Sequence, residues 1–155
     1  MSQGIRRIEL ASSSGYLLKV ASSTLRTAME EVLRPLGMTI THYSCLELLA
    51  YAPGSSNSEL ARGTFVTRQS MNVLLQALVR DGLVTRPVQP VSGRALPVAL
   101  TDAGRAQLAT ASAAVRAVED RMVSGLDPVD LDQLTGLLRR CIASLDAPVA
   151  EERLE

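Results

Sequence analysis

The sequence predicts a mainly α-helical fold with a small β component. Alanine, leucine and valine dominate the 155 residues, tryptophan is absent and there is one phenylalanine. Apolar residues recur at steps of three and four along most of the chain, which is typical of packed amphipathic helices. The exception is a pair of short apolar runs within residues 83–100, separated by proline, serine and glycine, which indicates a hairpin. A chain of this length can bury a real core, as one domain or as two small interlocked ones.

Two helices are expected in the first third of the chain. The first begins between Ile5 and Ser14 and ends near Arg34. Its apolar residues step by threes and fours along one long seam: Leu18, Ala21, Leu25, Ala28 and Val32. The second helix is expected over residues 40–51, with Thr39 as the N-cap that satisfies its free N–H groups.

A pair of shorter helices joined by a tight turn is predicted next. Ser58 is expected to cap the first of them, and Gly63 to end it in the left-handed conformation that glycine adopts at little cost. Thr67 is a second N-cap and opens a longer helix to about Asp81, where Gly82 stops it. Two helices in this order predict a helix-turn-helix unit.

The longer helix of this pair has two different faces. One face is an apolar stripe made of Met71, Leu74, Leu75 and Leu78. The other face contains amides, a guanidinium and a hydroxyl but no carboxylate: Arg68, Gln69, Ser70, Asn72, Val73 and Gln76. Amide and guanidinium groups can make paired hydrogen bonds to base edges in a DNA major groove. An ordinary solvated surface is the alternative interpretation of this face, which the helix alone leaves open.

The segment after this helix favours the DNA-binding interpretation. Its apolar runs, 83–86 and 96–100, predict a hairpin with Arg94 at its tip, which turns the helix-turn-helix into a winged one. From Ser58 to Arg94 there are five arginines and two carboxylates, a net charge of +3 in a chain whose total is 0. Local positive charge on a neutral protein fits a surface that contacts phosphates.

Two further helices are predicted after the hairpin. Thr101 can cap the first, which Gly125 ends, and Asp127 with Pro128 opens the second. Their apolar seams are Leu108, Ala111, Val115, Val118 and Met122 in the first, and Leu131, Leu134, Leu138, Cys141 and Leu145 in the second. A small winged unit cannot cover these seams, so we expect a homodimer whose terminal helices interlock. An intramolecular bundle is the alternative.

The expected organisation therefore has four parts. They are an N-terminal dimerisation helix (1–36), a winged helix-turn-helix (37–101), C-terminal dimerisation helices (102–146) and a flexible tail (147–155). No apolar run is long enough to cross a membrane, and the N-terminus does not resemble a signal peptide, which predicts a cytoplasmic protein. Cys45 and Cys141 have no metal-ligand spacing and are expected to be buried, reduced thiols.

No catalytic or cofactor motif is found. His42 and Cys45, three residues apart on one helix, could pair as base and nucleophile, but there is only one histidine. A phosphate-binding glycine loop, a metal-ligand cluster and a dinucleotide fingerprint are absent from the sequence. We therefore expect no enzyme activity and no cofactor.

The order and spacing of four segments resemble the multiple-antibiotic-resistance-regulator (MarR) family of bacterial transcription factors. The resemblance runs from Gly37 to Arg105 and depends on LGMTITHY (36–43), SELAR (58–62), VTRQSMNVLLQALVRDGLV (66–84) and LPVALTDAGR (96–105). It implies a homodimeric regulator, usually a repressor, that reads a pseudo-palindrome with two recognition helices roughly 34 Å apart. It also implies release by a small phenolic or other apolar effector bound in a cleft.

Candidate site residues follow from the helix-turn-helix geometry and the resemblance. Base edges are expected to be read by Gln69, Ser70, Asn72 and Val73, and phosphates to be contacted by Thr67, Arg68 and Gln76. The resemblance implies that Arg94 enters the minor groove, although Ser92 replaces the acidic residue that family members commonly have there. It also implies an effector cleft, for which the candidates are Tyr16, Met38, His42 and Tyr43.

Two other functions remain open for the same fold. One is a redox sensor, but serines and a glycine (residues 12–15) occupy the region where some relatives have a sensing cysteine. Cys45 and Cys141 lie in predicted helices, where buried thiols are usually inert. The other is a winged-helix module that binds protein, which the carboxylate-free helix face argues against.

Overall fold

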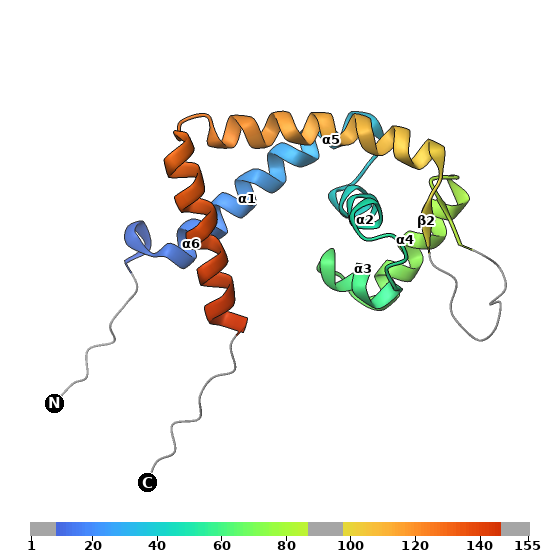
Figure 1. The fold of residues 1–155 in the computed structure, drawn as a ribbon, viewed down its shortest axis with the longest axis horizontal. Coiled ribbons are helices and arrows are strands. Elements are labelled where there is room, and N and C mark those ends of the chain that lie inside the picture. The colour runs from blue at the N-terminus through green and yellow to red at the C-terminus, as the bar shows by residue number, and fades with distance from the viewer. Residues whose placement is uncertain (1–8, 87–97, 147–155) are drawn as a thin grey trace, which may run out of the picture. The chain divides into compact units, whose positions relative to one another are not determined.

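A computed structural model describes residues 9–86 and 98–146 of the chain (Figure 1). The chain divides into two compact units, Met1–Val118 and Glu119–Glu155, and each is described by itself. Within the described residues, no helix is long and apolar enough to span a membrane. The helical class and the small β component that the sequence predicts are both confirmed.

The first unit contains most of the secondary structure. Its elements in chain order are η1 (Leu10–Ser12), α1 (Ser14–Leu33), η2 (Arg34–Leu36), α2 (Ile40–Tyr51), α3 (Asn57–Gly63), α4 (Arg68–Arg80), β1 (Val84–Thr85), β2 (Ala99–Leu100) and the larger part of α5 (Asp102–Val123). Helix α2 contacts α1, α3 and β2, and α4 contacts α3 and β1. The buried side chains of this core include Leu33, Cys45, Leu46, Leu49, Leu60, Met71, Leu75, Leu78, Val84 and Ala111.

The first two predicted helices are confirmed, including the cap of the second. The Thr39 hydroxyl accepts a hydrogen bond from the His42 N–H at 3.1 Å, and the His42 Nδ1 accepts one from the Thr39 N–H at 3.4 Å. This reciprocal capping box satisfies two N–H groups that would otherwise lack partners at the start of α2. It also means that the imidazole of His42 accepts a hydrogen bond, which requires an unprotonated Nδ1.

The boundaries of α3 differ from the sequence expectation. Ser56, not Ser58, is the N-cap: its hydroxyl accepts from the Glu59 N–H at 3.2 Å, and the Glu59 carboxylate accepts from the Ser56 N–H at 2.7 Å. Glu59 stands three residues after Ser56, so only this serine can form the reciprocal box. Gly63 does end the helix, but the left-handed residue is Phe65, with φ of 59°.

Helix α4 begins and ends where the sequence predicts. The Thr67 hydroxyl accepts a hydrogen bond from the Ser70 N–H at 3.1 Å, so Thr67 is the N-cap. Gly82 follows the C-cap Asp81 with φ of 74°, the left-handed conformation that terminates many helices. Met71, Leu75 and Leu78 are buried, and Leu74 packs against the same core.

Strands β1 and β2 form the antiparallel base of the predicted hairpin. Val84 pairs with Leu100, and Thr85 pairs with Ala99. The tip of the hairpin, including Ser92 and Arg94, lies outside the described residues. Helix α5 starts beside this base, where the Thr101 hydroxyl accepts from the Gly104 N–H at 2.9 Å and donates to the Gly82 carbonyl at 2.6 Å.

The second unit contains the end of α5 and α6 (Pro128–Asp146). Asp127 caps α6 as predicted, because its carboxylate accepts from the N–H groups of Val129 and Asp130, both at 2.8 Å. No residue of α6 is buried in the single chain. The expectation of a buried Cys141 is wrong for the single chain, in which Cys141 is exposed and no residue of α6 is buried.

Candidate nucleic-acid interface

The apolar stripe of α4 determines which of its faces reaches the surface. Met71, Leu75 and Leu78 are buried against α2 and α3 residues that include Cys45 and Leu60. The opposite side of the helix must therefore face away from the core. Its members Arg68, Gln69, Ser70, Val73 and Gln76 are exposed, and Asn72 is half-buried. The fold thus presents the predicted carboxylate-free face to solvent.

The N-terminus of α4 is held in place by polar contacts from two sides. The Thr67 hydroxyl donates to the Ser70 Oγ at 2.9 Å while it also caps the helix. The Asn57 Nδ2 donates to the Arg68 carbonyl at 3.2 Å, which ties the first turn of α3 to the first turn of α4. Asn57 was not among the sequence candidates, because nothing local indicates a contact eleven residues away. These contacts fix the end of the helix that enters the groove in helix-turn-helix proteins.

Asn72 has a partner that sequence reasoning also missed. Arg86, which directly follows β1, donates from its Nη1 to the Asn72 Oδ1 at 3.1 Å. The contact joins the base of the hairpin to the second turn of α4. It occupies one lone pair of the amide oxygen and leaves the second lone pair and both amide hydrogens for another partner.

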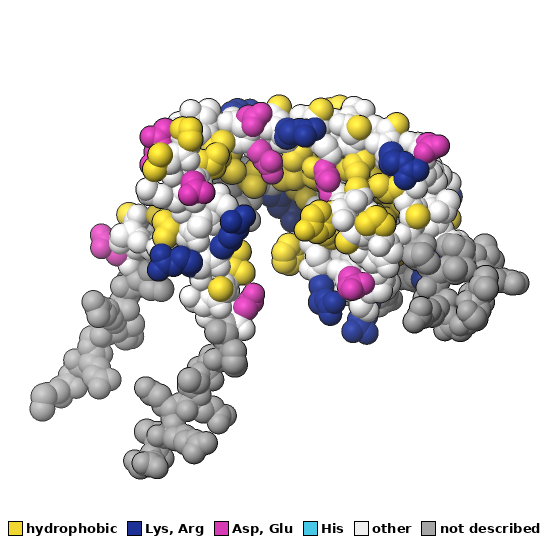
Figure 2. All heavy atoms as spheres, viewed as in Figure 1, with side chains coloured by type: hydrophobic (Ala, Val, Ile, Leu, Met, Phe, Trp, Pro, Cys, Tyr) yellow, Lys and Arg dark blue, Asp and Glu magenta, His cyan; other side chains and the backbone are white. Residues whose placement is uncertain are grey.

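The charges around α3 and α4 favour an anionic partner. Arg62, Arg68 and Arg86 are exposed, and Figure 2 shows dark blue basic side chains projecting from the part of the surface that α3 forms. The carboxylate of Glu59 is engaged at the N-terminus of α3, where the Ser56 N–H and hydroxyl lower its pKa. Asp81 lies 3.8 Å from the Arg80 guanidinium at the other end of α4. No Asp or Glu occurs between Glu59 and Asp81 in the sequence, so the exposed face of α4 carries no carboxylate.

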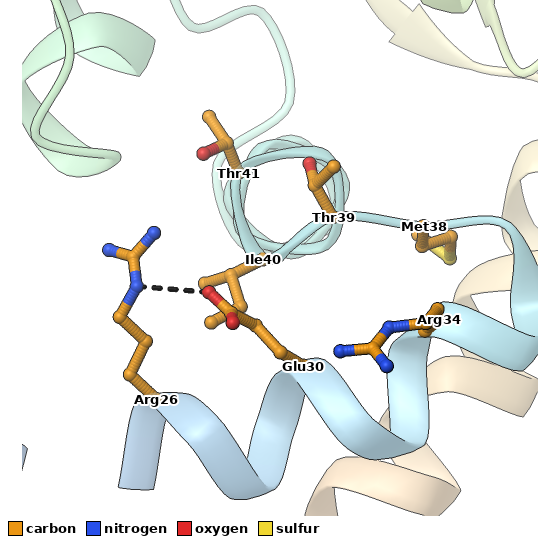
Figure 3. A pocket seen from close by; sticks show the side chains of 7 residues that line it. All are labelled: Arg26, Glu30, Arg34, Met38, Thr39, Ile40 and Thr41. Carbon is orange, nitrogen blue, oxygen red and sulfur yellow. Dashed lines mark hydrogen bonds and ion pairs between the residues drawn. The ribbon is translucent and has the colours of Figure 1, made fainter. Parts of the chain in front are cut away.

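A pocket of about 410 Å³ lies where α1 meets the start of α2 (Figure 3). It is lined by Arg26, Glu30, Arg34, Met38, Thr39, Ile40 and Thr41. The Arg26 Nε donates to the Glu30 carboxylate at 3.0 Å, and Figure 3 shows Ile40 reaching from α2 towards this pair. One carboxylate faces two guanidinium groups, so the pocket has an excess positive charge that suits a small anion.

The four effector candidates from the sequence are not brought together in this pocket. Met38 lines it, whereas Tyr16, His42 and Tyr43 are not among its lining residues. His42 is held in the capping box of α2. Burial lowers the pKa of His42 more than the negative charge of Asp81 raises it. The Tyr43 hydroxyl donates to the Glu47 carboxylate at 2.7 Å, which also accepts from Ser112. The arginines of the pocket were missed because their approach to α2 depends on the turn at η2.

The two cysteines differ in environment. Cys45 is buried, its Sγ lies 3.8 Å from the Met71 sulfur, and burial raises the pKa of its thiol to about 11. Cys141 is exposed on α6. Among the described residues, no group of three or more His, Cys, Asp or Glu side chains could hold a metal ion.

A helix-turn-helix followed by a hairpin base defines a winged helix-turn-helix protein, and comparisons with known proteins give the family. A sequence model of the MarR family matches residues 36–95. The HTH-type transcriptional repressor Rv2887 of Mycobacterium tuberculosis is 44% identical over 112 residues, which cover 72% of this chain and 81% of Rv2887. The chain therefore belongs to the MarR family.

Solved structures of Rv2887 have the same fold. Its complex with DNA has a TM-score of 0.71 and 36% identity, covering 84% of this chain and 98% of that one. Its complex with salicylic acid has a TM-score of 0.70 and 38% identity, covering 84% and 96%. Sequence and structure comparisons thus agree on the family that the order of segments indicates.

Proposed function

We propose that this protein is a transcriptional repressor that binds a pseudo-palindromic DNA operator as a homodimer. The observation that carries the proposal is the exposed face of α4, which contains amides and a guanidinium, has no carboxylate, and is fixed by a buried stripe on the opposite side. Family membership and the DNA complex of Rv2887 support this assignment. Such a protein works where the DNA is, which supports a cytoplasmic location.

The individual DNA contacts follow from position on α4. Gln69, Ser70, Asn72 and Val73 lie on its first turns and read bases, with the amides suited to adenine edges and Val73 to a thymine methyl. Thr67, Arg68 and Gln76 contact phosphates. Arg94, which the sequence predicts at the tip of the hairpin, is proposed to enter the adjacent minor groove. The named residues of α4 are exposed, apart from the half-buried Asn72, and this supports their roles.

Dimerisation covers the apolar side chains that a single chain leaves in solvent. On α1 these include Leu17, Leu18 and Val20, with exposed fractions of 52%, 44% and 43%. On α6, Val129, Leu131, Leu134, Leu137 and Ile142 are exposed. Exposed apolar surface on this scale marks an interface, and a second copy would place two α4 helices about one helical turn of DNA apart.

A small anionic aromatic molecule is the effector class that the pocket between α1 and α2 favours. Arg26 and Arg34 supply positive charge, and Met38 with Ile40 supplies apolar surface. The salicylic acid complex of Rv2887 supports a ligand with a carboxylate on a ring. Because α1 belongs to the dimerisation region and α2 to the DNA-binding unit, a ligand between them would change the spacing of the two α4 helices.

DNA binding is tested by measuring the affinity of the purified protein for the DNA upstream of its own gene, at several salt concentrations. We expect a linear fall of log K with log salt, and Arg68→Ala should reduce the slope by about 1.8, because it removes one phosphate contact, worth about 0.9, from each protomer of the dimer. Arg116→Ala is the matched control, because it removes an exposed arginine from the middle of α5. Salicylic acid should lower the affinity. A DNA affinity that does not change with salt concentration, or a protein that is monomeric at working concentrations, would contradict the proposal.

The other candidate functions have less support. A thiol sensor needs a reactive thiolate, whereas Cys45 is buried with a raised pKa. A protein-binding winged helix would not need a face without carboxylates. The expectations of no enzyme activity and no cofactor stay predictions, and the relative named above, Rv2887, is a transcriptional repressor.

A further inference from the structure

Phe65 combines two unfavourable features in the turn between α3 and α4. Its side chain is 94% exposed, the highest value among the large hydrophobic residues that the structure describes. Its φ of 59° is the only positive value of a non-glycine residue in the described part of the chain. An exposed phenylalanine gains nothing from burial, and a left-handed backbone is unfavourable for a residue with a Cβ. A residue with both features in an ordered turn indicates a function outside folding.

The turn itself explains why the left-handed conformation falls at this position. The Phe65 N–H donates to the Arg62 carbonyl at 3.2 Å, and the Val66 N–H donates to the Ala61 carbonyl at 3.0 Å. These two bonds form a Schellman motif at the end of α3, in which the residue at the Phe65 position is most often glycine. The chain has its glycine two residues earlier, at Gly63. Folding alone would therefore favour glycine or asparagine at position 65 over a large ring.

The surroundings of Phe65 identify the kind of partner. It lies two residues before Thr67, the N-cap of α4, and its sequence neighbours Arg62 and Arg68 are exposed cations. A protein interface needs a broad apolar patch. A single exposed ring in the turn before α4, with exposed arginines three positions away on either side in the sequence, fits the edge of a DNA groove, where deoxyribose offers apolar surface beside the phosphates.

We propose that Phe65 is a DNA-contact residue whose ring packs against deoxyribose at the edge of the groove that α4 enters. The inference rests on the proposed DNA-binding function and adds an apolar contact to its polar ones. An apolar contact releases no counterion, so it raises affinity without changing the salt dependence. This property separates the role of Phe65 from that of the neighbouring arginines.

The test uses substitutions that remove the ring but keep the turn. Phe65→Asn removes the ring and introduces a residue that tolerates the left-handed conformation, whereas Phe65→Tyr keeps an aromatic ring. We expect Phe65→Asn to lower operator affinity by about 10-fold to 100-fold for each ring, the range for burying one phenylalanine, and the homodimer loses two rings. The slope of log K against log salt should stay unchanged, and the melting temperature should be equal or higher. Phe65→Tyr should bind like the original protein.

The outcomes separate this inference from the proposed function. If Arg68→Ala reduces both affinity and salt slope while Phe65→Asn binds normally, the protein binds DNA but the inference is wrong. It is also wrong if Phe65→Asn lowers affinity only because the protein becomes monomeric or unfolds, which light scattering and thermal melting detect. If neither substitution changes binding, the protein binds DNA but both contact assignments are wrong. If the original protein shows no salt-dependent binding, the proposed function fails as well.

Discussion

The Arg86 guanidinium donates a hydrogen bond from Nη1 to the Asn72 Oδ1 at 3.1 Å. The contact links the residue that leaves β1 with the second turn of α4, fourteen positions earlier. An asparagine that reads adenine uses its amide oxygen and its amide N–H together. Arg86 therefore holds the orientation of the Asn72 amide, for which we propose a contact with a base.

This relationship predicts coupled effects on DNA binding. Asn72→Ala should relax specificity at one base pair by about 1–3 kcal/mol. In the Arg86→Ala background the same substitution should have a smaller effect, because the amide is no longer held in one orientation. A double-mutant cycle on operator affinity should give a coupling of roughly 0.5–3 kcal/mol. Asn72→Ala with Arg116→Ala is the control pair, and equal coupling in both cycles would contradict the role of Arg86.

Gly104 in α5 is expected to be intolerant of any side chain. A Cβ at this position would lie 2.0 Å from the Leu83 carbonyl oxygen, so the helix and the start of the hairpin would have to separate. Overpacking of this kind costs about 1–3 kcal/mol or more. Gly104→Ala should lower the free energy of unfolding by this amount in urea titrations at a fixed protein concentration.

Gly136→Ala provides the comparison for that measurement. Gly136 lies inside α6, and a Cβ there would meet nothing within 4 Å. Alanine should therefore raise the free energy of unfolding by roughly 0.5–1 kcal/mol, because it restricts the unfolded chain more than glycine does. Similar losses in the two variants would mean that the close contact between Gly104 and Leu83 is absent in solution.

His42 should make folding stability depend on pH. Burial, partly offset by Asp81, lowers the pKa of His42 below its usual value of 6.5, and its Nδ1 accepts the Thr39 N–H. The folded state therefore favours neutral His42. Its contribution to the free energy of unfolding is fully present above pH 6.5 and is lost as the pH falls below that value. His42→Gln keeps a capping-box side chain that cannot titrate. Unfolding free energies from pH 5 to 8 should fall less at low pH in this variant; parallel curves would contradict the expectation.

Cys45 should be unreactive in the folded protein. Its thiol is buried and has a pKa of about 11, so almost no thiolate is present near neutral pH. In a Cys141→Ser background, a thiol-specific reagent should modify the remaining cysteine only after denaturation. Peroxide should leave the DNA affinity of this variant unchanged. Rapid modification of the native protein, with loss of DNA binding, would instead favour the redox-sensing alternative.

Most helix caps could be predicted from the sequence, but the cap of α3 and its left-handed residue were assigned to the wrong positions. Thr39, Thr67, Thr101 and Asp127 cap their helices as the sequence indicates, because a cap involves residues two or three positions apart. The error at Ser58 was avoidable, since Glu59 three residues after Ser56 is the pattern of a capping box. The left-handed conformation was assigned to Gly63 because glycine adopts it most easily, whereas the structure has it at Phe65.

The sequence by itself determined the class of fold, the limits of the helices other than α3, and the face of α4 that can meet DNA. These features depend on apolar periodicity and capping, which act over a few residues. Only the tertiary structure decided that Arg86 reaches Asn72, that Leu83 leaves room for nothing larger than Gly104, and that arginines of α1 and η2 line a pocket beside α2. Such contacts join residues that are distant in the chain, and the packing of whole elements sets their geometry.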